Sequence, residues 1–202
     1  MKRNYLAAYK VFFGLLGFSA VVTEIAILGT KGVLNPGNFF SFFTIESNIF
    51  AFMMFLVCAF FVFAGKKSKK LDFFRGAATL YMIVTGIVFA VLLSGLEGVQ
   101  LTALPWDNAV LHYIIPIAVA FDWIIDPPSR RISFRRGLLW LIFPLAYLGY
   151  SLIRGPIAQW YPYPFLNPTH GGYGQIAITS LVILIVGVAL VWAVTRLGKK
   201  AK

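Results

Sequence analysis

Long runs of apolar residues, separated by short polar segments, extend along the whole chain. An α-helix rises 1.5 Å per residue, so about 20 apolar residues cross the hydrocarbon core of a bilayer. Because six runs come close to this length, we predict an all-α polytopic membrane protein, a single transmembrane domain over residues 1–202 in which six helices form one bundle. The expected spans are residues 9–29, 39–64, 74–94, 107–126, 137–154 and 176–197.

Composition agrees with this interpretation. Of the 202 residues, 59% are apolar and 12% are charged, whereas about 25% of the residues in a soluble domain are charged. The formal net charge of +11 would suggest nucleic-acid binding in a soluble protein. Here the positive charge lies between apolar runs, so membrane topology explains it better and no nucleic-acid partner is expected. The single cysteine, Cys58, lies inside an apolar run and is expected to be a core residue.

Lysine and arginine residues gather on alternate sides of the predicted spans. Sixteen lie on the side of the two termini, and only Lys31 and Arg154 lie on the other side. The positive-inside rule therefore places both termini and two basic loops in the cytoplasm. The expected location is a bacterial inner (plasma) membrane. The sixteen residues are Lys2, Arg3, Lys10, Lys66, Lys67, Lys69, Lys70, Arg75, Arg130, Arg131, Arg135, Arg136, Arg196, Lys199, Lys200 and Lys202.

The outer segment over residues 160–172 is rich in aromatic residues and proline. Tyrosine and tryptophan favour the headgroup level of a membrane, and repeated proline prevents a regular helix. We therefore expect this segment to lie along the outer interface, where it is a candidate lid.

Polar residues within the predicted spans cluster near their outer ends. Such residues are costly in lipid and usually face the interior of the bundle or a wet cavity. Thr44 and His112 each lie about five residues, or ~8 Å, below the outer ends of their spans. The outer-leaflet layer that they share is the candidate site. Other members of this layer are Glu24, Glu46, Ser47, Asn48, Asn108, Tyr147, Tyr150, Ser151 and Arg154.

Helical spacing refines this layer. Ser47 and Asn48 follow Thr44 at three and four residues and share its face, whereas Glu46 points about 200° away. Asn108 and His112 are stacked one turn apart. Pro116 removes the amide that would bond the His112 carbonyl, so we expect a kink with a freed carbonyl beside the imidazole. A break of this kind is tolerated at membrane depth where it lines a cavity.

The layer contains a nucleophile and a base. A threonine hydroxyl needs a base to remove its proton, and imidazole is the side chain best suited to this near neutral pH. The second histidine, His170, lies in the outer loop, so the expected catalytic pair is Thr44 and His112. Glu24 or Glu46 is the candidate to orient the imidazole, and Asn48, Asn108 or a tyrosine is the candidate donor to a developing oxyanion. Ser47 and Tyr150 are further supporting or substrate-binding residues, and Arg154 is a candidate partner of a lipid carboxylate or phosphate.

Three segments of the chain resemble the androgen-induced-gene family of membrane proteins, in its bacterial six-span branch. They are Phe-Phe-Thr44-Ile-Glu-Ser-Asn48, Leu-Pro-Trp106-Asp-Asn108 followed by Leu-His112-Tyr, and Tyr161-Pro-Tyr-Pro-Phe165-Leu-Asn. Animal members of that family are threonine hydrolases that cleave fatty acid esters of hydroxy fatty acids, with one intramembrane threonine and one intramembrane histidine. By motif position these two residues map to Thr44 and His112. The resemblance implies a fatty acyl ester substrate and no metal or organic cofactor.

Two other functions remain open from the sequence. Glu24, Glu46 and His112 also suit a proton relay in a small transporter. A transport path needs polar groups at several depths, but the inner halves of the spans offer little beyond Thr79, Tyr81 and Asp122. A noncatalytic lipid-binding protein would be favoured if the Thr44 hydroxyl bonded only its own backbone, as threonine in membrane helices often does.

Overall fold

The computed structural model describes residues 2–96 and 102–197. Within these ranges the regular structure is helical, and six helical segments are long and apolar enough to cross a membrane. The chain is therefore an integral membrane protein, and the all-α bundle with six spans is confirmed. The segments are Arg3–Thr30, Phe43–Phe63, Lys69–Leu93, Pro105–Ile125, Phe134–Ala158 and Gly172–Leu197. Three of the basic residues counted above, Lys199, Lys200 and Lys202, lie outside the described residues.

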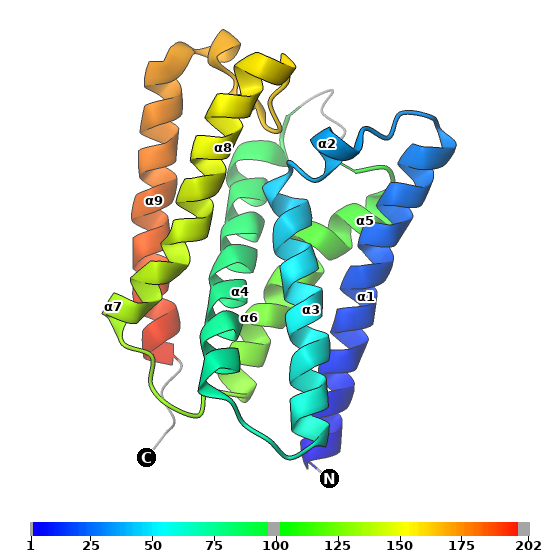
Figure 1. Cartoon of the computed structure of the whole chain (residues 1–202), viewed down its shortest axis with the longest axis vertical. Coiled ribbons are helices and arrows are strands. Elements are labelled where there is room, and N and C mark those ends of the chain that lie inside the picture. Colours follow the sequence, from blue (N-terminus) through cyan, green and yellow to red (C-terminus); the bar gives the residue numbers. More distant parts are fainter. Residues whose placement is uncertain (1, 97–101, 198–202) are drawn as a thin grey trace.

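Helix α4 lies at the centre of the bundle and contacts α3, α6 and α9 (Figure 1). Helices α1 and α3 pack together on one side, and α8 and α9 lie on the other. The start of α1 and the end of α9 lie at the same end of the bundle, which we call the basic end. The helices are α1 (Lys2–Thr30), α2 (Pro36–Phe39), α3 (Phe43–Phe63), α4 (Lys69–Val88), α5 (Pro105–Ala109), α6 (Ile115–Ile125), α7 (Phe134–Gly137), α8 (Ile142–Ala158) and α9 (Gly172–Leu197).

The start of the second span differs from the prediction. The apolar run begins at residue 39, but α3 begins at Phe43. The Asn35 side chain caps the short helix α2 and accepts from the Asn38 amide, and the chain then turns before α3. Thr44 is consequently the second residue of α3, rather than a residue more than one turn inside the helix.

Other boundaries extend beyond the apolar runs that predicted them. Helix α1 begins at Lys2 instead of residue 9, and α4 begins at Lys69 after its cap, Ser68. Helix α8 continues to Ala158, four residues past the expected end. Hydrogen bonding along a helix continues into interfacial polar residues, whose long side chains extend toward water. Hydropathy alone therefore underestimates helix length.

Helix α4 packs closely against two tryptophan rings at Gly76. A Cβ atom at Gly76 in α4 would overlap the ring of Trp140 and lie 3.2 Å from Trp123. Both indoles are almost fully buried, and the Trp123 Nε1–H donates to the Val194 carbonyl at 2.9 Å. Small residues at such contacts allow membrane helices to approach closely.

We expect Gly76→Ala to lower the free energy of unfolding by about 1–3 kcal/mol, because the two packed rings leave no room for a methyl group. Thermal unfolding in detergent, followed by tryptophan fluorescence, measures the change. The matched control is Gly149→Ala in α8, where no atom lies within 4 Å of the added Cβ. Equal unfolding temperatures for the two variants would contradict the packing described here.

A buried ion-pair network joins α1, α4 and the end of α6 near the basic end. Lys10 is completely buried and pairs with Asp122, and with Asp126 at 3.0 Å. Arg75 pairs with Asp122 at 2.9 Å, Asp126 at 3.3 Å and Asp72 at 3.3 Å. Asp72 also accepts from the Ser129 amide at 2.7 Å.

This network changes the interpretation of two basic residues. The sequence analysis counted Lys10 and Arg75 with the basic residues of the cytoplasmic loops, but both side chains lie inside the bundle. The three carboxylates that pair with them make this burial possible, because a buried charge is tolerated when it is paired. The loops next to these helices remain positively charged, because their other lysine and arginine residues, such as Lys66 and Lys67, are exposed.

Candidate functional site

A cavity of about 230 Å³ lies at the end of the bundle opposite the basic end. Its wall includes Glu24 from α1, Thr44 from α3, His112 from the helical segment before α6, and Tyr163 from the loop after α8. Three residues predicted from their depth in different spans therefore line one cavity. The described hydrogen bonds do not include a direct one between Thr44 and His112.

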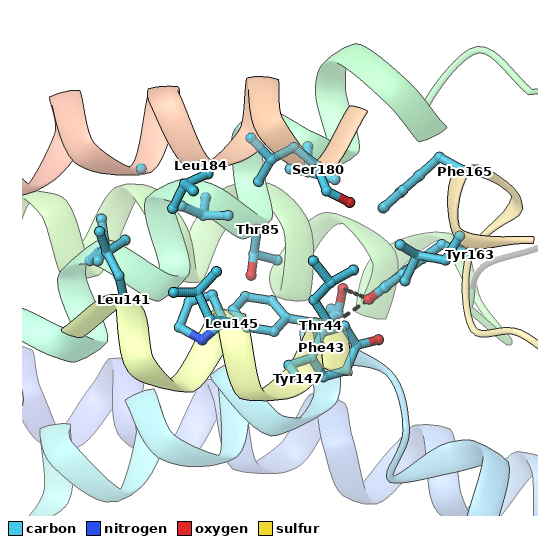
Figure 2. A pocket seen from close by; sticks show the side chains of 18 of the residues that line it. Phe43, Thr44, Thr85, Leu141, Leu145, Tyr147, Tyr163, Phe165, Ser180 and Leu184 are labelled. Atoms are coloured by element: carbon cyan, nitrogen blue, oxygen red, sulfur yellow. Dashed lines mark hydrogen bonds between the residues drawn. The ribbon is translucent and has the colours of Figure 1, made fainter. Parts of the chain in front are cut away.

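Thr44 lies at the N-terminal end of a long helix. The residue before α3, Phe42, makes no side-chain capping bond. Instead, the Thr44 amide donates to the Tyr163 hydroxyl at 3.1 Å, and the hydroxyl oxygens of Thr44 and Tyr163 are 3.2 Å apart (Figure 2). The N-terminus of a helix carries a partial positive charge. The Thr44 hydroxyl therefore lies where negative charge is stabilised.

The Thr44 hydroxyl is not bonded to its own helix, unlike several other hydroxyls of the bundle. Ser47, Thr79 and Thr195 each donate to the carbonyl four residues earlier. The corresponding residue for Thr44 is Phe40, which precedes α3. Because of this position at the helix start, the hydroxyl faces the cavity and Tyr163.

His112 is held in one orientation by two contacts. Its Nδ1 lies 3.2 Å from the Asn108 carbonyl oxygen. Since a carbonyl oxygen only accepts, Nδ1 carries the proton, and Nε2 then has the free lone pair of a base. The imidazole stacks on Phe89, with ring centroids 4.0 Å apart and planes 21° apart.

Two π-helical turns meet at this stacked pair. One covers Phe89–Leu93 at the end of α4, and the other covers Val110–Ile114 just before α6. Pro116 follows the second turn, at the position where the sequence predicts a kink, and Gly86 in α4 packs against Pro116 and the His112 carbonyl. Wider turns of this type accommodate a missing amide and occur often at functional sites.

A second cavity, of about 110 Å³, lies on the other side of Thr44. Side chains from α3, α4, α8, α9 and the loop at residues 163–166 line it, and most of them are apolar (Figure 2). Thr44, Tyr163 and Leu93 line both cavities. We call the cavity of about 110 Å³ the apolar cavity and the one of about 230 Å³, which has more polar lining residues, the polar cavity. The Thr44 hydroxyl therefore lies where the two meet.

Two other predicted residues support this junction. Glu24 is buried and accepts from the Ala103 amide at 2.8 Å, which connects α1 to the segment before α5. Asn48 lies behind the cavity wall and donates to the Thr44 carbonyl at 2.9 Å and to the Leu111 carbonyl at 3.1 Å. Asn48 thus ties the turn that carries Thr44 to the turn that carries His112.

Most of the other predicted residues lie outside the two cavity walls. Ser47 accepts from the Thr85 hydroxyl at 3.3 Å, and Glu46 is half-buried on a different side of α3. Asn108 contributes its carbonyl to His112, and the Tyr150 hydroxyl lies 2.8 Å from that of Ser41. The remaining two hydroxyls of the layer are placed as follows: Tyr147 lines the apolar cavity and Ser151 is buried.

Arg154 lies at the rim of the polar cavity. It donates to the Asn38 side chain at 2.7 Å and stacks on the Trp160 ring at 5.3 Å. Asn38 and Trp160 both line the cavity. The Nη1 atom of Arg154 is buried and makes no hydrogen bond to a described residue.

Tyr163 is the site residue that sequence reasoning missed. The loop after α8 was expected to lie along the interface, but it enters the bundle and buries Tyr163 and Leu166. Two short 3₁₀ turns, Pro164–Leu166 and Pro168–His170, shape the loop. Burial raises the pKa of Tyr163 to about 12, so its hydroxyl remains a donor at neutral pH. The Tyr-Pro-Tyr-Pro repeat is apparent in the sequence, but it does not show how deeply Tyr163 is inserted into the bundle.

Comparison of the chain with protein-family models, with curated proteins and with solved structures gives no match. The resemblance to the androgen-induced-gene family therefore stays a prediction. Among the described residues, no three His, Cys, Asp or Glu side chains gather closely enough to hold a metal ion.

Proposed function

We propose that this protein is an integral membrane hydrolase of lipid esters, with Thr44 as the nucleophile and His112 as the general base. One observation carries the proposal: the Thr44 hydroxyl lies at the positive end of α3, at the junction of an apolar cavity and a polar cavity that His112 also lines. Fatty acid esters of hydroxy fatty acids, or similar esters, are the substrate class that the resemblance implies.

In the proposed reaction, Nε2 of His112 takes the proton from the Thr44 hydroxyl, directly or through one water molecule. The threonine oxygen attacks the ester carbonyl, and the bond to the alcohol oxygen breaks. His112 passes the proton to the departing alcohol. Water, deprotonated by His112, then attacks the acyl carbonyl, the bond to the Thr44 oxygen breaks, and His112 returns the proton to that oxygen as the fatty acid is released. The bond from Nδ1 to the Asn108 carbonyl keeps the imidazole in the required tautomer.

Tyr163 and the N-terminus of α3 stabilise the negative charge of the tetrahedral intermediate. The Tyr163 hydroxyl is the donor nearest to the Thr44 oxygen, at 3.2 Å. It accepts from the Thr44 amide, which leaves its own proton free to donate. Donors fixed before the reaction stabilise such an oxyanion without reorganisation.

The two parts of the substrate are assigned to the two cavities according to polarity. The apolar cavity takes the acyl chain, and Thr85 and Ser180 are its polar members apart from Thr44 and the tyrosines. The polar cavity takes the alcohol portion, near Asn38 and Glu24. Arg154 at the rim, whose Nη1 has no hydrogen-bond partner among the described residues, suits a carboxylate on that portion.

The placement of polar residues favours hydrolysis over transport. Glu46 is absent from the cavity wall that contains Glu24 and His112. Toward the basic end, Met82, Leu111 and Ile115 are completely buried in an apolar cluster. Two buried polar side chains beside this cluster, Asn48 and Thr85, are hydrogen bonded to neighbouring groups, and neither is ionisable as a proton relay requires.

Hydrolysis of long-chain esters by the purified protein tests the proposal. In detergent micelles and in liposomes, we expect release of fatty acid from 4-nitrophenyl acyl esters, with higher kcat/KM for long chains than for acetate. A fluorophosphonate probe should label the peptide that contains Thr44, as located by mass spectrometry. If the folded protein neither hydrolyses these esters nor reacts with the probe at Thr44, the proposed ester hydrolase activity is wrong.

Replacing Tyr163 by phenylalanine is expected to lower kcat by about 10²–10³-fold with little change in KM, because the variant lacks the oxyanion donor. Steady-state hydrolysis measures both constants. Tyr150→Phe is the matched control, since its hydroxyl bonds Ser41 outside the cavities. If Tyr163→Phe retains full kcat, or changes only the unfolding temperature, Tyr163 has no part in the chemistry.

A further inference from the structure

A third cavity, of about 370 Å³, lies at the basic end of the bundle. It has no lining residue in common with the two cavities at Thr44. Five segments form it: the start of α1, the end of α3, the loop between α3 and α4, the start of α4 and the loop after α6. We call it the basic cavity.

The mouth of the basic cavity carries positive charge. Arg3, Lys66 and Lys67 line it and are exposed, and none of them forms a salt bridge with a described residue. Arg75 lines its deeper part, and the buried Nε atom of Arg75 has no hydrogen-bond partner among the described residues. The mouth therefore has donors available to an anion.

The carboxylates that line this cavity are already engaged. Asp72 pairs with Arg75 and accepts from Ser129, and Asp126 pairs with Lys10 and Arg75. With Asp122, they exceed the two buried cations by one negative charge, so Arg3, Lys66 and Lys67 leave this end of the cavity with a net positive charge. Helix α4 also begins at this cavity, after Ser68, and the positive end of its dipole adds to the attraction for an anion.

Apolar side chains form the other part of the wall. Leu6, Phe61, Val62 and Leu71 line the cavity and are half-buried. A free phosphate ion would use only the basic part of this wall. A phospholipid would use both, with its phosphate against the cations and its glycerol and upper acyl chains against the apolar side chains.

We propose that the basic cavity binds the headgroup of an anionic phospholipid from the leaflet at the basic end. The phosphate lies between Arg3, Lys66 and Lys67, and the Arg75 Nε–H donates to it from below. Basic pockets between spanning helices on the cytoplasmic side suit such headgroups. This lipid is a bound partner of the fold and is independent of the ester substrate at Thr44.

Native mass spectrometry of the full-length protein with added phosphatidylglycerol tests the proposal. We expect Lys66→Gln/Lys67→Gln to weaken binding about tenfold or more, because two phosphate contacts are lost. The matched control is Lys69→Gln/Lys70→Gln. It removes the same charge from neighbouring exposed residues that do not line the cavity, and should change binding by less than about twofold. Circular dichroism establishes that both variants are folded.

Two further probes define the ligand. Phosphatidylcholine, whose headgroup has no net charge, should bind at least about tenfold more weakly than phosphatidylglycerol, since a net anion gains most from the cations. Inorganic phosphate at millimolar concentration should not displace the phosphatidylglycerol. Equal weakening by the two lysine pairs would mean a diffuse surface attraction and would overturn the proposal. Displacement by inorganic phosphate would overturn the assignment to a lipid.

Discussion

Thr44→Ala is expected to reduce ester hydrolysis by at least about 10³-fold, since alanine removes the attacking oxygen. His112→Ala should have an effect of similar size, because the two residues act as one unit and their losses are not additive. The double variant should therefore be no slower than either single variant. Initial rates with a long-chain ester, measured at matched protein concentration, give all three values.

The chain offers a matched control for the nucleophile. Ser47 lies one turn further along α3, and its hydroxyl donates to the Phe43 carbonyl outside both cavities. Ser47→Ala should therefore retain most of the activity, and Thr44→Ser, which keeps a hydroxyl, should retain part of it. A folded Thr44→Ala variant with undiminished activity would eliminate the proposed mechanism.

Breaking the ion-pair network should cause the largest loss of stability. We expect Lys10→Met to lower the free energy of unfolding by about 3–5 kcal/mol, because three carboxylates would then face Arg75 alone in a buried setting. Thermal or denaturant unfolding in one detergent measures the change. Trp123 provides a local probe, since Arg75 lies 5.6 Å from its ring.

A double variant separates this electrostatic cost from lost packing. Lys10→Met/Asp122→Leu removes one cation and one carboxylate together, and it should be more stable than Lys10→Met alone. Lys70→Met, at an exposed position on α4, should change stability by less than about 0.5 kcal/mol. A double variant that is less stable than Lys10→Met would indicate that the lost contacts, rather than the uncompensated charge, dominate.

The architecture and the central pair of the site could be predicted from the sequence. Apolar runs of sufficient length have few solutions in a bilayer, so the six spans followed from hydropathy. Thr44 and His112 were assigned to one layer from their distance to the span ends, and they line one cavity. The distance of a residue from the end of its span is an imprecise measure of depth, but it is sufficient to predict which residues of different spans lie at the same level.

Other features depend on tertiary contacts that hydropathy does not contain. Phe39 to Phe42 are largely apolar, like the helix that follows, so hydropathy does not indicate the break before α3. For the same reason it does not indicate that Thr44 lies at the start of a helix. The chemistry of Tyr163 depends on how far a proline-rich loop enters the bundle. Lys10 became a buried cation only because Asp122 of α6 and Asp126, which follows that helix, pair with it.

The order in which the network residues are synthesised bears on membrane insertion. The ribosome produces Lys10 first and Arg75 next, while Asp122 and Asp126 follow about 50 residues after Arg75. Before α6 is inserted, Arg75 has Asp72 of its own helix as a partner, whereas both carboxylates that pair with Lys10 are still missing, so the lysine has to extend toward the headgroups at the basic end. Arrival of α6 brings Asp122 and Asp126, which pair with both cations. The charge of Lys10 in the first span is therefore matched only when the fourth span has been inserted, which makes insertion of α6 a condition for burying this lysine.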